Sequence, residues 1–255
     1  MEKAFFRNFV ALIIALFVLI KKRPKKDELN LKGNWSGLII RSTAGAVGIF
    51  CNFYAVDHLL LSDASMLNKM SPFFGVIFSF FILKEKPSLK QILLVIGAFL
   101  GSLLVIKPTF SNMYLFPSLI GLLGGMGAGL AYTMVRKLTN RGVYPPFIVF
   151  FFSFYTLLLT LPFMIFTYKA MTGMQLLILL LAGLAAASGQ FAVTLAYRYA
   201  PAKEISVFDY NQIVVAAILG FIFLNQIPDA LAIIGYAVVI LMGILMAMLQ
   251  RKQIN

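Results

Sequence analysis

The chain has 255 residues, of which 61% are hydrophobic and 12% are charged, and its mean hydropathy is +0.92. This apolar content exceeds the roughly half that is typical of soluble domains and excludes a soluble globular protein. The net charge of +13 is explained by basic loops beside an anionic inner leaflet, so nucleic-acid binding is not needed to account for it.

Nine segments have the length and composition of membrane spans. About 20 apolar residues are needed to cross a hydrocarbon core about 30 Å thick. In chain order the segments cover about residues 4–20, 36–57, 62–83, 89–106, 115–135, 146–167, 174–197, 203–224 and 229–249. The first is the weakest, because it is short and carries Arg7. The sequence therefore predicts an all-α integral membrane protein with about nine transmembrane helices.

The basic residues favour one side of the membrane. If the first segment enters from outside, 16 of the 22 Lys and Arg residues fall in cytoplasmic segments. Four fall in outer segments, namely Lys3, Arg7, Lys107 and Lys169. Cytoplasmic loops of membrane proteins carry such an excess of positive charge. We therefore predict a multi-pass protein of the cytoplasmic membrane, with the N terminus outside and the C terminus in the cytoplasm.

The chain also repeats itself at a constant offset of 141 residues. The matched pairs include Phe6 with Phe147, Gly48 with Gly189, Phe80 with Phe221, Leu83 with Leu224 and Pro87 with Pro228. The offset moves each segment by five spans, an odd number, so the two halves have opposite orientations in the membrane. Inverted repeats place a substrate site at their interface near the bilayer midplane. We predict two repeats, residues 1–108 with four helices and residues 115–250 with five.

These features resemble the EamA repeat of the drug/metabolite transporter superfamily. The first copy carries the resemblance through Phe6 and Arg7, the stretch 41–55, Pro72, and Glu85 with Pro87. The second copy carries it through the stretches 190–196 and 200–206, and through Gln226 with Pro228. The resemblance implies a ten-helix carrier that moves amino acids, amines, cofactors or other small metabolites, often outward. The segment at 115–135 has no repeat partner, so we expect this chain to lack the first of the ten helices.

Small residues recur inside the segments at helical spacing. The fifth segment carries Gly121, Gly125 and Gly129, the second carries Gly45 and Gly48, and the seventh carries Gly189. Small residues let helix backbones approach closely in lipid. We predict helix packing at these glycines.

Three ionisable side chains lie well inside segments, where burying a charge is costly and usually indicates a function. Arg41 lies near the cytoplasmic end of its span, and we expect it to snorkel to the interface. Lys69 and Asp209 each follow the start of a span by about seven residues. We predict that Lys69 accepts an anionic group of a substrate and Asp209 an amine. The alternative is that both face inner packing and satisfy each other or a backbone carbonyl.

Further polar and aromatic residues complete the predicted substrate site. The offset aligns Asn68 with Asp209 and Lys69 with Tyr210. The full predicted set is Asn52, Tyr54, Asn68, Lys69, Tyr132, Asp209, Tyr210, Asn211 and Gln212. Pro72 lies within the third segment, where it frees a backbone carbonyl and can kink or hinge the helix. A gating hinge and a static kink are both open at this point.

Other chemistries lack the residues they require. The single cysteine, Cys51, excludes an internal disulfide and a cysteine metal cage, and the single histidine, His58, cannot form a histidine cluster. No GxxxxGK[ST] motif is found, so the chain does not drive transport with ATP. We expect no metal, no cofactor and no enzymatic activity, since no span carries a paired carboxylate or an activated nucleophile.

Three functional classes follow from these observations. A secondary carrier or exporter of small metabolites is favoured. A non-transporting truncated chain, or a subunit of a membrane complex, is the alternative that the missing helix favours. An intramembrane enzyme is the least supported class. The expected partners are the lipid bilayer and a small-molecule substrate, and we also consider a homodimer formed through the unpartnered flank of the 115–135 segment.

Overall fold

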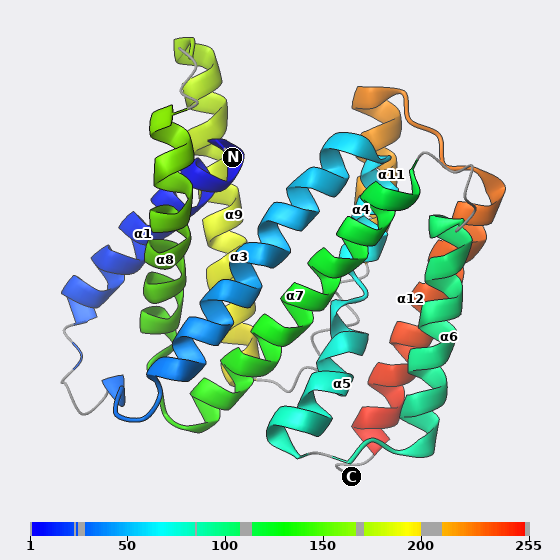
Figure 1. Cartoon of the computed structure of the whole chain (residues 1–255), viewed down its shortest axis with the longest axis horizontal. Coiled ribbons are helices and arrows are strands. Elements are labelled where there is room, and N and C mark those ends of the chain that lie inside the picture. The colour runs from blue at the N-terminus through cyan, green and yellow to red at the C-terminus, as the bar shows by residue number, and fades with distance from the viewer. Residues whose placement is uncertain are drawn as a thin grey trace. The chain divides into compact units, whose positions relative to one another are not determined.

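The chain forms helices joined by short connections in the computed structural model, which describes residues 2–22, 24, 29–84, 86–107, 114–166, 171–199 and 211–252 (Figure 1). The helices are α1 (Glu2–Lys22), α3 (Trp35–His58), α4 (Leu61–Asn68), α5 (Ser71–Leu83), α6 (Leu89–Ile106), α7 (Leu115–Asn140), α8 (Pro145–Phe166), α9 (Gly173–Tyr199), α11 (Asn211–Leu224) and α12 (Ala230–Lys252). No β-strand occurs among these residues.

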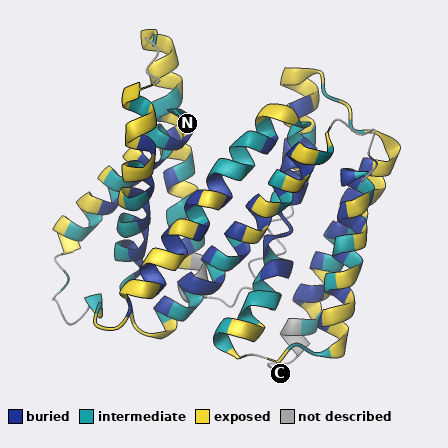
Figure 2. Cartoon of the chain, in the orientation of Figure 1, coloured by how far each residue is buried: buried dark blue, intermediate teal, exposed yellow. Residues whose placement is uncertain are grey.

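Eight helical stretches are long and apolar enough to cross a membrane, and α4 with α5 counts as one of them. A ninth, shorter apolar helix covers Gln212–Leu224. Only 11–56% of each 18-residue window is buried within the protein, and Figure 2 shows exposed residues along most helices. Apolar surface of this extent needs lipid to cover it. The predicted all-α membrane protein of about nine helices is confirmed.

The chain divides into two compact units. One unit contains Met1–Ala46 and Met134–Tyr199, and the other contains Val47–Thr133 and Ala200–Asn255. Both α3 and α7 contribute to each unit, so neither unit coincides with one predicted repeat. The division into repeats at 1–108 and 115–250 stays a prediction.

In the first unit, α1 packs against α8 and α9. The buried residues of α1 are all small or short: Ala4, Asn8, Ala11 and Ala15. They recur every three or four positions and therefore form one face of the helix. Asn8 Nδ2 donates to the Ala4 carbonyl at 2.8 Å, which keeps the polar group of that face bonded. Small residues on one face let the backbone of α1 approach its neighbours closely.

In the second unit, α6 and α12 form an antiparallel pair (Figure 1). Lys107, directly after α6, forms an ion pair with Asp229, directly before α12, so the two helices run in opposite directions. Small residues again permit the contact, since a Cβ on Gly101 would lie 2.8 Å from Val238 Cγ1. A Cβ on Gly235 would lie 2.8 Å from the Gly101 carbonyl oxygen.

The helix ends repeat at the offset found in the sequence. The helices α5 and α11 end at Leu83 and Leu224, and α6 and α12 begin at Leu89 and Ala230. Both differences are 141 residues. The helices α6 and α12 run antiparallel, the arrangement that the predicted inverted repeat requires of corresponding elements.

Candidate functional site

The third span is interrupted in its middle. Helix α4 ends at Asn68, Lys69 is the C-cap residue, and α5 begins at Ser71. The Met70 N–H donates to the Leu67 carbonyl at 3.2 Å, a three-residue step where an α-helix takes four. Pro72 lies in the first turn of α5 and has no N–H to offer the Asn68 carbonyl. The proline therefore follows a break between two helices, in place of the kink within one helix that the sequence suggested, and its role as a gating hinge stays a prediction.

The interruption holds buried polar side chains. Lys69 is 8% exposed and Ser71 is 5% exposed, while Asn68 is half-buried. Burying an ammonium group within a span is costly, and such groups commonly mark substrate or ion pathways. Interrupted spans are also where transporters bind substrates, because unwound backbone is tolerated where it lines a cavity.

Glycines on one face of α7 let this helix pack closely against the interruption between α4 and α5. A Cβ on Gly125 would lie 2.5 Å from the Leu67 carbonyl oxygen. A Cβ on Gly129 would lie 2.6 Å from the Ser71 carbonyl oxygen. Both distances are far below van der Waals contact, so a larger residue would push α7 away from the α4–α5 backbone. Gly121, one turn earlier, faces Leu67 Cδ1 and the Ala55 Cβ in the same way.

A second face of α7 packs closely on α3. A Cβ on Gly48 would lie 3.2 Å from the Gly124 carbonyl oxygen and from Ala128 N. A Cβ on Gly124 would lie 3.2 Å from Asn52 N. Within this unit, α7 therefore contacts the interrupted span with one face and the part of α3 that carries Asn52 with another.

Two aromatic residues of the predicted site, Tyr54 and Tyr132, lie on α3 and α7. The Tyr54 ring stacks on His58 with ring centroids 4.1 Å apart, and Phe116 meets it edge-on at 6.1 Å. Tyr54 thus belongs to an aromatic cluster at the end of α3. Tyr132 is half-buried on α7, three residues after Gly129.

The second half of the predicted site is described in small part. Asp209 and Tyr210 lie outside the described residues, as does the side chain of Asn211, and Gln212 is exposed at the start of α11. The predicted pairing of Lys69 with Asp209 therefore stays a prediction. Among the described residues, no three His, Cys, Asp or Glu side chains gather as metal ligands.

The remaining packing glycines differ from one another. A Cβ on Gly45 would lie 2.8 Å from Phe152 Cε2. Around Gly189, by contrast, no described atom lies within 4 Å of a Cβ position. The close approach predicted at Gly189 is therefore not found in the described part of the chain. Spacing alone cannot show which face of a helix meets another helix.

The prediction that Arg41 snorkels to the interface is wrong. Arg41 is 2% exposed, and its guanidinium carbon lies 3.7 Å from the centroid of the Phe152 ring. The cation is held against the face of an aromatic ring inside the first unit, an arrangement that cation–π attraction favours.

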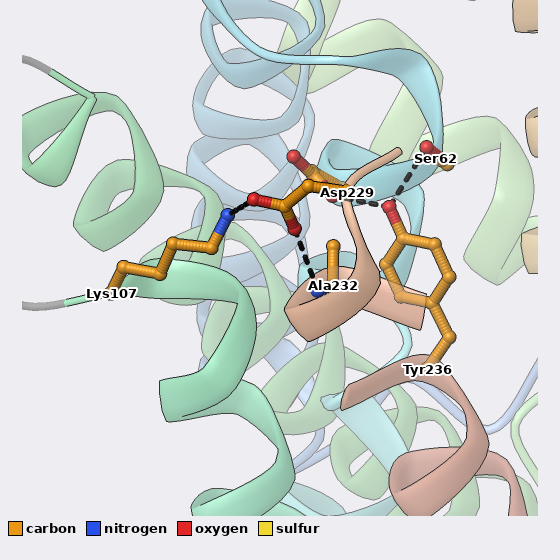
Figure 3. A network of polar contacts seen from close by, with 6 residues as sticks. Ser62, Lys107, Asp229, Ala232 and Tyr236 are labelled. Carbon is orange, nitrogen blue, oxygen red and sulfur yellow. Dashed lines mark hydrogen bonds and ion pairs between the residues drawn. The ribbon is translucent and has the colours of Figure 1, made fainter. Parts of the chain in front are cut away.

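The second unit also contains a polar network that the sequence did not predict (Figure 3). The Tyr236 hydroxyl lies 2.9 Å from Ser62 Oγ and also donates to the Asp63 carboxylate. Nearby, the Lys107 ammonium donates to Asp229, whose other oxygen accepts the Ala232 N–H at 2.9 Å. Lys107 lies 122 residues from Asp229 and Asp63 lies 173 residues from Tyr236 in the sequence, so no local pattern indicates these two contacts.

Two further observations concern the same end of this unit. Gln226 Oε1 accepts the N–H of Leu61, the first residue of α4, at 2.8 Å. The hydrogen bond from Lys107, together with the one from Ala232 N, holds the pKa of the Asp229 carboxyl below its usual value. The contacts join the starts of α4 and α12 with the end of α6, all of which the charge pattern predicts to be on the outer side.

Comparison with known proteins gives a consistent result. The EamA-like transporter family matches residues 1–107 and 115–249. The chain is 32% identical over 240 residues to the pseudopaline exporter CntI of Pseudomonas aeruginosa, covering 94% of this chain and 83% of that protein. It is 28% identical over 251 residues to a riboflavin transporter of Brucella anthropi, covering 91% and 84%.

More distant proteins share the same architecture. Human solute carrier family 35 member G1 is 26% identical over 246 residues, covering 89% of this chain and 66% of that protein. A solved crystal structure, 16% identical, superposes with a TM-score of 0.70 over 98% of this chain and 88% of the other, which establishes the fold. With both halves matched and relatives aligned over nearly the whole chain, the protein belongs to the EamA-like transporter family of the drug/metabolite transporter superfamily.

Proposed function

We propose that this protein is a secondary transporter that carries small organic metabolites across the cytoplasmic membrane by alternating access. The observation that carries the proposal is the buried ammonium of Lys69 at the interruption between α4 and α5. Charged side chains buried within membrane spans commonly mark substrate or ion pathways. A site for a polar solute gives both features a use.

The chemistry of this position favours a substrate with an anionic group. The Lys69 ammonium would bind a carboxylate, and the amide of Asn68 would donate to or accept from a neighbouring polar group. Asp209, in the corresponding stretch of the second copy, would take an amine. The class that fits both is amino acids and related zwitterions, with Asn52 and Tyr132 as further contacts from α3 and α7.

The relatives and the charge pattern support the proposed direction of transport and the proposed membrane. The Pseudomonas relative is named an exporter and the Brucella relative a transporter of riboflavin, which supports outward movement of a small organic solute. The excess of cytoplasmic Lys and Arg supports an N terminus outside and a C terminus in the cytoplasm.

The test is the thermal stability of the detergent-purified chain against a panel of amino acids, amines, riboflavin and organic anions. A ligand that binds the folded state raises the apparent melting temperature. We expect a selective increase that Lys69→Ala and Asp209→Asn abolish. Lys32→Ala, which removes an exposed cation before α3, should leave the increase intact. An increase that survives in both site variants would place the ligand elsewhere and contradict the proposed site.

A further inference from the structure

A groove of about 470 Å³ lies between α5 and α6. Ile77, Phe80 and Phe81 line it from α5, and Ile92 and Ile96 line it from α6. The α5 residues lie at positions i, i+3 and i+4 and the α6 residues lie four apart, so each set forms an apolar stripe on one face of its helix. The volume lies within the range of about 300–1,000 Å³ that small-molecule sites occupy.

One end of this groove is cationic. Among the described residues of the lining, Lys86, in the α5–α6 connection, is the one that carries a charge. Lys84 ends α5 and Lys90 lies in the first turn of α6, and both are exposed. The stretch 84–90 carries three lysines and one glutamate, a net charge of +2. The charge pattern predicts this connection to be on the cytoplasmic side of the membrane, where anionic lipids are concentrated.

From these features we infer that the groove binds an anionic phospholipid of the cytoplasmic leaflet. An acyl chain lies between the stripes of α5 and α6, and the phosphate headgroup is held by Lys86 with Lys84 and Lys90 around it. The arrangement matches the lipid at both ends, because the groove wall is apolar and its mouth is basic. A soluble organic anion would satisfy the lysines but would leave the apolar stripes without a partner.

The second copy of the repeat shows that the fold of this connection does not require the lysines. The corresponding stretch, residues 225–231, also begins with a residue of positive φ and has a proline at the same place. It contains no lysine or arginine. The three cations are therefore a property of the inner connection alone, as a binding site for an inner-leaflet headgroup requires.

Native mass spectrometry of the full chain in detergent tests this inference, with phosphatidylglycerol and phosphatidylcholine of identical acyl chains at equal concentration. We expect the wild type to retain phosphatidylglycerol in preference. Lys86→Ala should lower that retention about fivefold, the effect of one basic residue near a charged membrane surface. Lys32→Ala, which removes an exposed cation before α3, should leave it unchanged.

A second pair of variants separates the groove from the surface charge. Ile92→Trp fills the groove from a 43% exposed position and should displace the phospholipid. Leu93→Trp, 58% exposed on the next position of α6 and outside the lining, is its control and should not. Equal retention of the two lipids by the wild type would overturn the inference. So would loss in Lys86→Ala without loss in Ile92→Trp, because the headgroup would then bind loop charges with no acyl site.

Discussion

The α5–α6 connection (residues 84–88) and the α11–α12 connection (225–229) have matching backbone features but different side chains. Lys84 and Asn225 follow their helices with φ of 58° and 51°. Ser88 and Asp229 cap the next helices, accepting the N–H of Gln91 and of Ala232. Every one of these features recurs at the offset of 141 residues, so the two copies specify the same turn.

The side chains of the two connections point to different surroundings. Asp229 also binds Lys107, and Gln226 holds the first residue of α4, so the α11–α12 connection ties three helix ends together. The α5–α6 connection carries lysines instead and borders the apolar groove. The predicted inverted repeat would put the two connections on opposite sides of the membrane, and each would then carry the charges that its own side favours.

The largest loss of stability should come from the polar network of Tyr236, Ser62 and Asp63. Tyr236→Phe removes the hydroxyl that donates to the half-buried Asp63, and we expect a loss of about 1–2 kcal/mol in the free energy of unfolding. Unfolding in mixtures of mild detergent and sodium dodecyl sulfate measures it. Tyr144→Phe, at the start of α8, is the control. Equal losses in the two variants would mean that the network adds nothing specific to stability.

The two capping residues give a matched comparison. Ser88→Ala and Asp229→Ala should each lower stability by about 1 kcal/mol, the usual effect of losing an N-cap. Asp229→Ala should lose more, because the ion pair with Lys107 is removed as well. Asp229→Asn keeps the cap and loses the charge, so it should lie between Asp229→Ala and the wild type. If Ser88→Ala is the more damaging change, the added role of Asp229 is wrong.

Glycine substitution directly tests the positive φ that Lys84 and Asn225 have in common. Lys84→Gly and Asn225→Gly should each raise stability by up to about 1 kcal/mol, because glycine adopts positive φ without steric cost. The gain should be larger at Lys84, since asparagine already tolerates this conformation. Circular dichroism melting in detergent detects it. Lys84→Ala keeps the strained conformation and should give no gain.

The smallest effect concerns Lys107 and depends on pH. Its side chain and that of Asp229 are 35% and 56% exposed, so the pair contributes less than about 1 kcal/mol. Because the pKa of Asp229 is lowered in the fold, its contribution is present above the unfolded value of about 3.9 and declines as pH falls through the folded value. Melting temperatures from pH 6 to 3 should therefore converge between the wild type and Lys107→Ala. A constant difference across this range would contradict the assignment.

Much of the architecture is predictable from the sequence. Apolar runs define the spans. The constant offset relates the end of α5 and the start of α6 to the end of α11 and the start of α12, because these helix boundaries depend on local residues such as Pro87 and Pro228. The resemblance to the EamA repeat is confirmed by the family match.

The contacts between helices are not predictable in the same way. The glycines of α7 were identified, but the sequence does not state that Gly125 meets the Leu67 carbonyl or that Gly48 meets Gly124. The position of the break at Lys69 depends on hydrogen bonds that Pro72 cannot make, and it lies before the proline. The partners Asp63 and Tyr236 are 173 residues apart, and each alone resembles an interfacial polar residue.

The most direct measurement is transport of the stabilising ligand by the chain reconstituted in liposomes, comparing wild type, Lys69→Ala, Lys69→Arg and Lys32→Ala. We predict that Lys69→Ala lowers the transport rate at low substrate concentration about tenfold or more, the cost of losing one charged hydrogen bond. Lys69→Arg should restore part of the rate, and Lys32→Ala should match the wild type. Full transport by correctly inserted Lys69→Ala would contradict the central claim that the interruption between α4 and α5 is the substrate site.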